Sequence, residues 1–204
     1  MLSFSCCIIS FATAISTVAQ TRTTLQFPSR TFATNGGDDG NFLNEWFSSE
    51  LNALGERPMV ELTTEISEEY RFTLLPSFSK PIAVRVEIKK DGTGTATSEI
   101  GDWAGGYAPK SGVTRKTRAL SRDEILEIHA VVADFWKISA VATGDPGGED
   151  GTEWIMEGND GQRYHAAYRW EGSVLTPIGR YFLADVAQLR DEAMKASASV
   201  ARDR

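Results

Sequence analysis

The chain has 204 residues, of which 41% are hydrophobic and 24% are charged, and its net charge is -7. This length indicates one domain, and this composition can bury a sizeable core, which excludes a disordered chain. The acidic balance argues against nucleic acid or an anionic membrane as a partner, because both require a basic surface. Composition by itself selects no activity.

The N-terminus has the pattern of a secretory leader. Residues 1–21 contain no charged side chain, and residues 2–18 are mostly apolar or small. The run suits the apolar region of a signal peptide and is short for a membrane span. We predict a signal peptide over 1–19, cleaved after Ala19, with Ala14 as the alternative site. A plastid or mitochondrial leader and an uncleaved anchor stay open as alternatives, since no basic residue precedes the apolar run. We expect an exported protein, periplasmic or secreted, with no stable membrane insertion after cleavage.

Both cysteines, Cys6 and Cys7, lie within this predicted leader. The mature chain would then have no disulfide, no thiol nucleophile and no cysteine ligand for a metal. Only His129 and His165 remain as nitrogen ligands, whereas zinc needs three or four ligands. Two acidic, glycine-rich loops lack the oxygen spacing of an EF-hand. We therefore expect no metal and no cofactor.

Three further parts of the chain follow the leader. Residues 20–40 are polar and end in a glycine-rich run, which predicts a linker. Residues 41–190 carry regular hydrophobic patterns and predict a single α+β domain. Residues 191–204 are polar and rich in Ala and Ser, so we expect a fraying C-terminal tail.

Hydrophobic periodicity and turn signals place the elements of this domain. They are, in chain order, a helix over 41–54, strands over 70–74, 82–89 and 93–100, a short strand over 113–118, a helix over 121–137, a hairpin over 153–170 and a helix from Thr176. Gly55 ends the first helix, Asp91-Gly92 forms a hairpin turn, and Ser121 with Glu124 forms a capping box. The expected fold is a twisted antiparallel sheet of about five to six strands with helices packed on one face. The other face is expected to be solvated.

The final hairpin suggests a register. If Asn159-Asp160-Gly161 forms a three-residue turn, Glu157 lies opposite Arg163 and the apolar residues share the other face. His165 and Arg169 then lie on the same polar face as Glu157. A slip by one residue would mix the two faces, so polarity favours this register.

Several segments together resemble a known group of proteins. They are Tyr70-Arg71-Phe72, Pro81 to Val86, Gly105-Gly106-Tyr107, Phe135-Trp136, Asp150 to Gly158 and Tyr164 to Trp170. The set resembles a family of uncharacterised exported bacterial proteins that carry a signal peptide, and its sharpest part is the Trp154–Trp170 hairpin. Glu171-Gly172 stands where that family has Ser-Pro. The resemblance implies export and this type of fold, and it implies no reaction.

The best candidate for a ligand site is the polar row of Glu157, Arg163, His165 and Arg169, with Arg85 on a neighbouring strand. Arginines beside a histidine suit a carboxylate or phosphate ligand. His165 next to Glu157 could also act as a general base. The structural alternative is cross-strand ion pairing on a solvated face, which is common and weak.

Trp103 and Tyr107 lie in a glycine-rich loop and either form a binding platform or fold back on the sheet. Two functions follow. The first is a non-catalytic binding or interaction module of the cell envelope, whose partner is an unknown protein, peptide or envelope component. The alternative is a small hydrolase or isomerase that uses His165 and Glu157. We favour the first, because the chain has neither a Gly-x-Ser-x-Gly elbow nor a phosphate-binding glycine loop.

Overall fold

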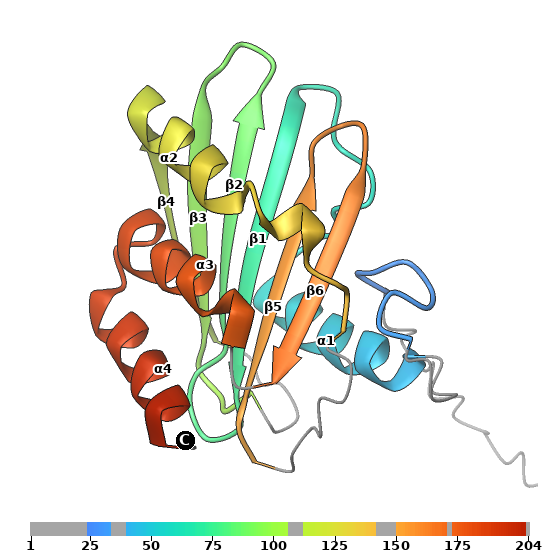
Figure 1. Cartoon of the computed structure of the whole chain (residues 1–204), viewed down its shortest axis with the longest axis vertical. Coiled ribbons are helices and arrows are strands. Elements are labelled where there is room, and N and C mark those ends of the chain that lie inside the picture. The colour runs from blue at the N-terminus through green and yellow to red at the C-terminus, as the bar shows by residue number, and fades with distance from the viewer. Residues whose placement is uncertain (1–23, 34–39, 106–111, 142–149, 171–172, 203–204) are drawn as a thin grey trace, which may run out of the picture.

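The structure is a computed structural model that describes residues 24–33, 40–105, 112–141, 150–170 and 173–202. The predicted leader lies outside these residues. Six antiparallel strands form one open sheet, and they are β1 (Ile66–Pro76), β2 (Ile82–Lys89), β3 (Gly94–Gly101), β4 (Val113–Leu120), β5 (Thr152–Asn159) and β6 (Tyr164–Trp170). Their order across the sheet is β4-β3-β2-β1-β5-β6, so β4 and β6 are the edges (Figure 1).

Four α-helices pack against this sheet, and they are α1 (Asn41–Leu54), α2 (Arg122–Val132), α3 (Thr176–Tyr181) and α4 (Arg190–Arg202). A short π-helical turn, η3 (Phe182–Val186), continues α3. Helices α2, α3 and α4 lie on one face of the sheet, and α1 lies on the opposite face (Figure 1). The predicted α+β class with an antiparallel sheet is confirmed.

Several helices and turns begin or end at the residues that short sequence signals predict. Gly55 takes a left-handed φ of 86° directly after α1, and Gly92 takes a φ of 83° in the turn between β2 and β3. Ser121 Oγ accepts from the Glu124 backbone N–H at 3.2 Å, and the Glu124 carboxylate accepts from the Ser121 N–H at 2.8 Å. This reciprocal pair is the predicted capping box of α2.

The first face of the sheet holds the larger core. Val84 and Val86 of β2 are fully buried there, as their alternation predicts. Phe135 packs onto the same face from the turn that follows α2, and Phe182 packs onto it from η3. Gly179 of α3 lies so close to the sheet that a Cβ there would approach Phe72 and Trp154 to 2.5 Å.

The second face is also buried, which corrects the expectation of a solvated face. Ala83 and Arg85 of β2 are 0% and 6% exposed. This face is covered by α1 and by Phe27 and Phe32. These two phenylalanines belong to the predicted linker and are themselves buried. Phe27, Phe32 and Phe47 form an edge-to-face aromatic cluster, with ring centroids 4.9–6.4 Å apart. The sheet therefore has helices on both faces, and residues 24–33 belong to the domain.

The predicted polar tail is also partly wrong. Residues 190–202 form α4, and Ala193 and Ala196 are buried in the first core. Alanine at a spacing of three residues gives the helix one small apolar side, which can lie close to the sheet. The domain therefore extends beyond its predicted C-terminal boundary.

Candidate functional site

The β5–β6 hairpin has a different register from the predicted one. Glu157 lies opposite Ala166, and His165 lies opposite Gly158. The turn holds four residues, 160–163, and Asp160 Oδ1 accepts from the backbone N–H of Arg163 at 3.0 Å. The displacement from the predicted pairing is odd, so it exchanges faces. Glu157 and His165 therefore lie on opposite sides of the sheet, which removes the proposed acid–base pair.

His165 lies on the α2 side of the sheet, where its side chain makes packing and hydrogen-bond contacts within the fold. Its Nε2 lies 2.7 Å from the carbonyl oxygen of Ile138, so this nitrogen carries the proton and donates. Its ring packs on Phe135, with centroids 4.9 Å apart. The second histidine, His129 of α2, is half-buried, and its Nε2 lies 2.9 Å from Glu68 Oε2 of β1.

The two arginines of the predicted row are also dispersed. Arg163 pairs with Asp160 at 2.8 Å within the turn, and its guanidinium lies 4.0 Å from the ring centroid of Trp136. Arg169 is buried and donates to the hydroxyl of Ser139 at 3.2 Å. The structure therefore does not gather Arg163, His165 and Arg169 around one ligand.

Trp103 is not an exposed platform. It is 5% exposed, and its indole N–H donates to Glu50 Oε2 of α1 at 2.8 Å. Of the two alternatives, the structure therefore shows Trp103 folded back onto the sheet. Tyr107, its predicted companion, lies outside the described residues.

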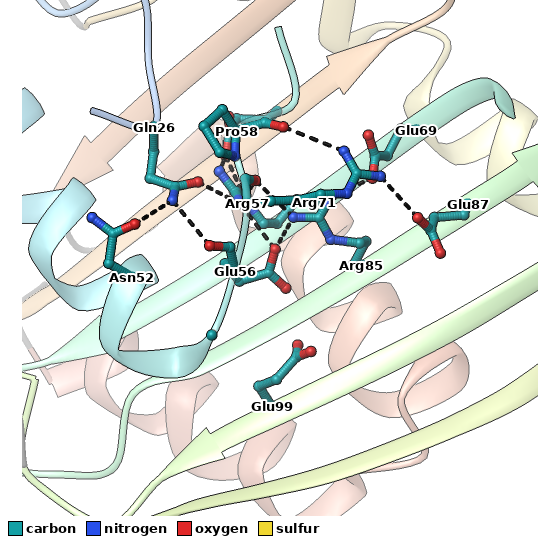
Figure 2. A network of polar contacts seen from close by, with 12 residues as sticks. Gln26, Asn52, Glu56, Arg57, Pro58, Glu69, Arg71, Arg85, Glu87 and Glu99 are labelled. Carbon is teal, nitrogen blue, oxygen red and sulfur yellow. Dashed lines mark hydrogen bonds and ion pairs between the residues drawn. The ribbon is translucent and has the colours of Figure 1, made fainter. Parts of the chain in front are cut away.

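Arg85 and Glu157 do belong to one cluster, a buried network of ion pairs between the sheet and α1 (Figure 2). Arg71 on β1 is its centre and was not among the predicted site residues. Its Nε donates to Glu157 Oε2 at 2.7 Å, and its Nη1 donates to Glu56 Oε2 at 2.9 Å. Arg85 pairs with Glu56 and with Glu69. Figure 2 shows the guanidinium groups of Arg71 and Arg85 converging on Glu56.

Further polar groups extend this network to the N-terminal segment and the surface. Gln26 contacts Arg71 through its carbonyl oxygen at 3.2 Å and donates to Asn52 at 2.7 Å. Arg57 bridges Glu69 and Glu87 at 2.6 and 2.9 Å. The network thereby connects residues 24–33 and the end of α1 to the strands of the sheet.

The network has the properties of a structural element. Arg71 and Glu157 are 0% exposed, and each charged group is paired with an opposite charge. Buried charges need such pairing, because desolvation otherwise costs several kcal/mol per ion. With its arginines engaged by internal carboxylates, the network offers no free cation to a soluble anion. We conclude that Arg85 and Glu157 hold the fold together.

An open groove lies elsewhere, beside β4 on the face of the sheet that α2, α3 and α4 cover. It consists of two adjoining hollows of about 390 and 300 Å³. Arg118, Val186 and Gln188 line both of them. Gln188 takes a φ of 59°, which is uncommon for a residue other than glycine and shapes the turn between η3 and α4.

Strand β4 forms one wall of this groove and one edge of the sheet. Beyond the paired ends of β3 and β4, Asp102 donates its backbone N–H to the carbonyl of Gly112 at 2.8 Å. Because hydrogen-bonded pairs alternate along antiparallel strands, the even-numbered residues of β4 bond to β3. The odd-numbered residues direct their N–H and C=O groups away from the sheet, and they are Val113, Arg115, Thr117 and Ala119.

This edge is open in the described part of the chain, where no strand follows β4 in the sheet. Seven of its eight residues are not buried. The opposite edge, β6, is partly covered, because Tyr168 donates its N–H to the carbonyl of Ala140 at 2.8 Å. An uncovered strand edge can pair with another extended chain.

Comparison with models of known protein families gives no match, and no curated protein matches the chain. The resemblance to exported bacterial proteins therefore stays a prediction. None of the described helices is both long and apolar enough to cross a membrane. Within the same residues, no group of three or more His, Cys, Asp or Glu side chains is arranged to hold a metal ion.

Proposed function

We propose that this protein is an exported, non-catalytic binding module of the cell envelope that docks its partner on the open edge of β4. The observation that carries the proposal is the row of outward N–H and C=O groups at Val113, Arg115, Thr117 and Ala119, in which the Ala119 carbonyl already accepts from Arg118 Nη1 at 3.3 Å. Such a row supplies main-chain hydrogen bonds to an added strand. The absence of charge over residues 1–21 and the mostly apolar or small run over 2–18 support export.

The test of docking uses a proline at the edge. Thr117→Pro removes an outward N–H and places a ring in the path of an added strand, while it leaves the bonds to β3 intact. It also removes the contact between the hydroxyls of Thr117 and Thr97, which lie 3.0 Å apart. Thr97→Ala removes the same contact from the neighbouring strand and is the matched control.

The immobilised protein is incubated with cell-envelope and secreted fractions, and captured proteins are identified by mass spectrometry. We expect a partner that the wild type and Thr97→Ala retain and that Thr117→Pro loses. Capture that is equal in all three proteins would place the partner site elsewhere. Export is tested separately by N-terminal sequencing of the mature protein, for which we expect a start at Gln20.

A further inference from the structure

We propose that the partner is a protein segment that is acidic and extended, and that it binds as a seventh strand beside β4. This inference rests on the proposed function and adds the chemistry of the partner. It depends on the charges of β4, on the groove next to it and on the direction of its backbone groups.

Strand β4 is strongly basic in an acidic protein. Its eight residues, Val113–Leu120, include Arg115, Lys116 and Arg118 and no acid, whereas the whole chain has 28 Asp plus Glu against 21 Lys plus Arg. Lys116 is exposed, and no described residue pairs with it. A positive edge on a negative molecule attracts and orients an acidic segment.

The groove beside β4 is also positively charged where it borders the strand. The smaller hollow is lined by Lys116 and Arg118 and by uncharged residues. Two acids of the larger hollow are engaged by neighbours, since Glu124 pairs with Arg118 at 2.7 Å and Glu127 accepts from the hydroxyl of Tyr181 at 3.3 Å. A third acid, Asp185, also lines this hollow and is exposed. In the smaller hollow, which holds no acid, the cation without a carboxylate partner among the described residues is Lys116.

An added strand would place its side chains alternately on the two faces of the sheet. Those opposite Lys116 and Arg118 would lie on the side of the groove. Those opposite Arg115 would lie on the other face, where Arg115 is half-exposed and pairs with Glu99 at 3.1 Å. Acidic residues on both faces of the segment would thus meet a cation, and opposite charges across a strand pair are favourable.

The same charges disfavour a second copy of this chain. Pairing of β4 with β4 of another molecule would bring three cations against three cations, without an acid on either strand. Like charges directly opposite each other destabilise a strand pair. The edge therefore selects against self-association and in favour of an acidic partner.

Fluorescence polarisation with labelled eight-residue peptides tests this proposal. A peptide of alternating Glu and Val is the probe, and as a strand it places its acids on one face, where they can lie opposite Lys116. A Lys–Val peptide tests the charge, and an N-methylated Glu–Val peptide tests main-chain pairing. We expect the Glu–Val peptide to bind, and to bind about tenfold more weakly to Thr117→Pro or to Lys116→Glu, since tenfold corresponds to one lost hydrogen bond or charge contact. Thr97→Ala should bind like the wild type.

Amide exchange measured by NMR locates the bound peptide. With the Glu–Val peptide present, exchange of the outward amides of Arg115, Thr117 and Ala119 should slow. The amides of Lys116 and Arg118 already bond to β3 and should change little. This alternation distinguishes strand addition from loose electrostatic contact.

Three results would overturn the proposal. They are equal binding of the Lys–Val or N-methylated peptide, protection at amides outside β4, and a dimer in sedimentation that Thr117→Pro dissociates. If Thr117→Pro abolishes capture from the envelope fraction and yet the Glu–Val peptide does not bind, the edge is a docking site for a partner of other chemistry. If capture is also unaffected, the proposed function fails as well.

Discussion

Arg71 and Glu157 lie directly opposite each other on β1 and β5, and the guanidinium Nε donates to the carboxylate at 2.7 Å. The two residues are separated by 86 positions in the chain, and both are fully buried. A slip of one residue between these strands would turn one member of the pair to the opposite face. The pair therefore specifies how the hairpin of β5 and β6 joins the rest of the sheet.

Arg71→Met should destabilise the protein by about 3 kcal/mol, because Glu157 would remain buried without its cation. Urea unfolding followed by tryptophan fluorescence measures the free energy of unfolding. The double variant with Glu157→Gln is the control. Its loss should be smaller than the sum of the two single losses by about 2 kcal/mol, since the pair acts as a unit. Additive losses would show that Arg71 acts through its other contacts.

Gly179→Ala should destabilise the protein by about 2 kcal/mol. In an open helix, the same change usually stabilises by up to about 1 kcal/mol. Here the new methyl group would lie 2.5 Å from ring atoms of Phe72 and Trp154, both fully buried, and overpacking of this kind is costly. Adding Phe72→Leu should recover part of the loss in a urea unfolding experiment. A stabilised Gly179→Ala variant would contradict the close approach of α3 to the sheet.

Ser121→Ala should destabilise the protein by about 1 kcal/mol, because the side chain caps the first turn of α2. Ser121→Asp keeps an acceptor oxygen at this position and should remain close to the wild type. The midpoint of thermal unfolding compares the three proteins. Equal losses in both variants would show that the hydroxyl has another role than capping.

The parts of the fold that short segments encode were predictable from the sequence. Helix α1 ends at Gly55 and α2 begins at the Ser121 cap, because the signals for these ends lie within a few residues of one another. The burial of Val84 and Val86 likewise follows from alternation within one strand. Such features need no knowledge of distant contacts.

The second core was not predictable in this way, because its parts come from distant positions. Arg71 and Arg85 alternate with apolar residues just as solvent-facing residues do. Their burial depends on Glu56 and on Phe27, which reach the same face from other parts of the chain. The predicted faces of the β5–β6 hairpin were wrong for a local reason. Its turn has four residues instead of three, and this change exchanges the two faces.

The candidate docking site has a signal in the sequence, which is a cluster of basic residues. Arg115, Lys116 and Arg118 crowd a predicted short strand in an otherwise acidic chain. Charged residues, lysine above all, are typical of edge strands, where they discourage pairing with unwanted chains. The position of β4 at the edge of the sheet could not be derived from this segment alone, because it depends on the order of all six strands.

Glu50→Gln should change how stability depends on pH. Burial raises the pKa of Glu50 to about 7, against an ordinary value of 4.5, and the hydrogen bond from Trp103 only partly opposes this shift. The folded protein therefore binds a proton at Glu50 that the unfolded chain releases near pH 4.5. Its contribution to stability is complete below pH 4.5, falls as the pH rises toward 7 and is lost above it.

Glutamine cannot ionise and still offers an oxygen to the indole N–H of Trp103. Glu50→Gln should therefore match the wild type near pH 4.5 and exceed its free energy of unfolding by about 3 kcal/mol at pH 8. Glu45→Gln is the matched control, because Glu45 is an exposed acid on the same helix and the change in net charge is identical. Urea unfolding at pH 4.5, 6 and 8 gives the comparison. Parallel profiles for the wild type and Glu50→Gln would mean that Glu50 is ionised in the folded protein throughout this range, and that the space under α1 admits enough water to solvate it.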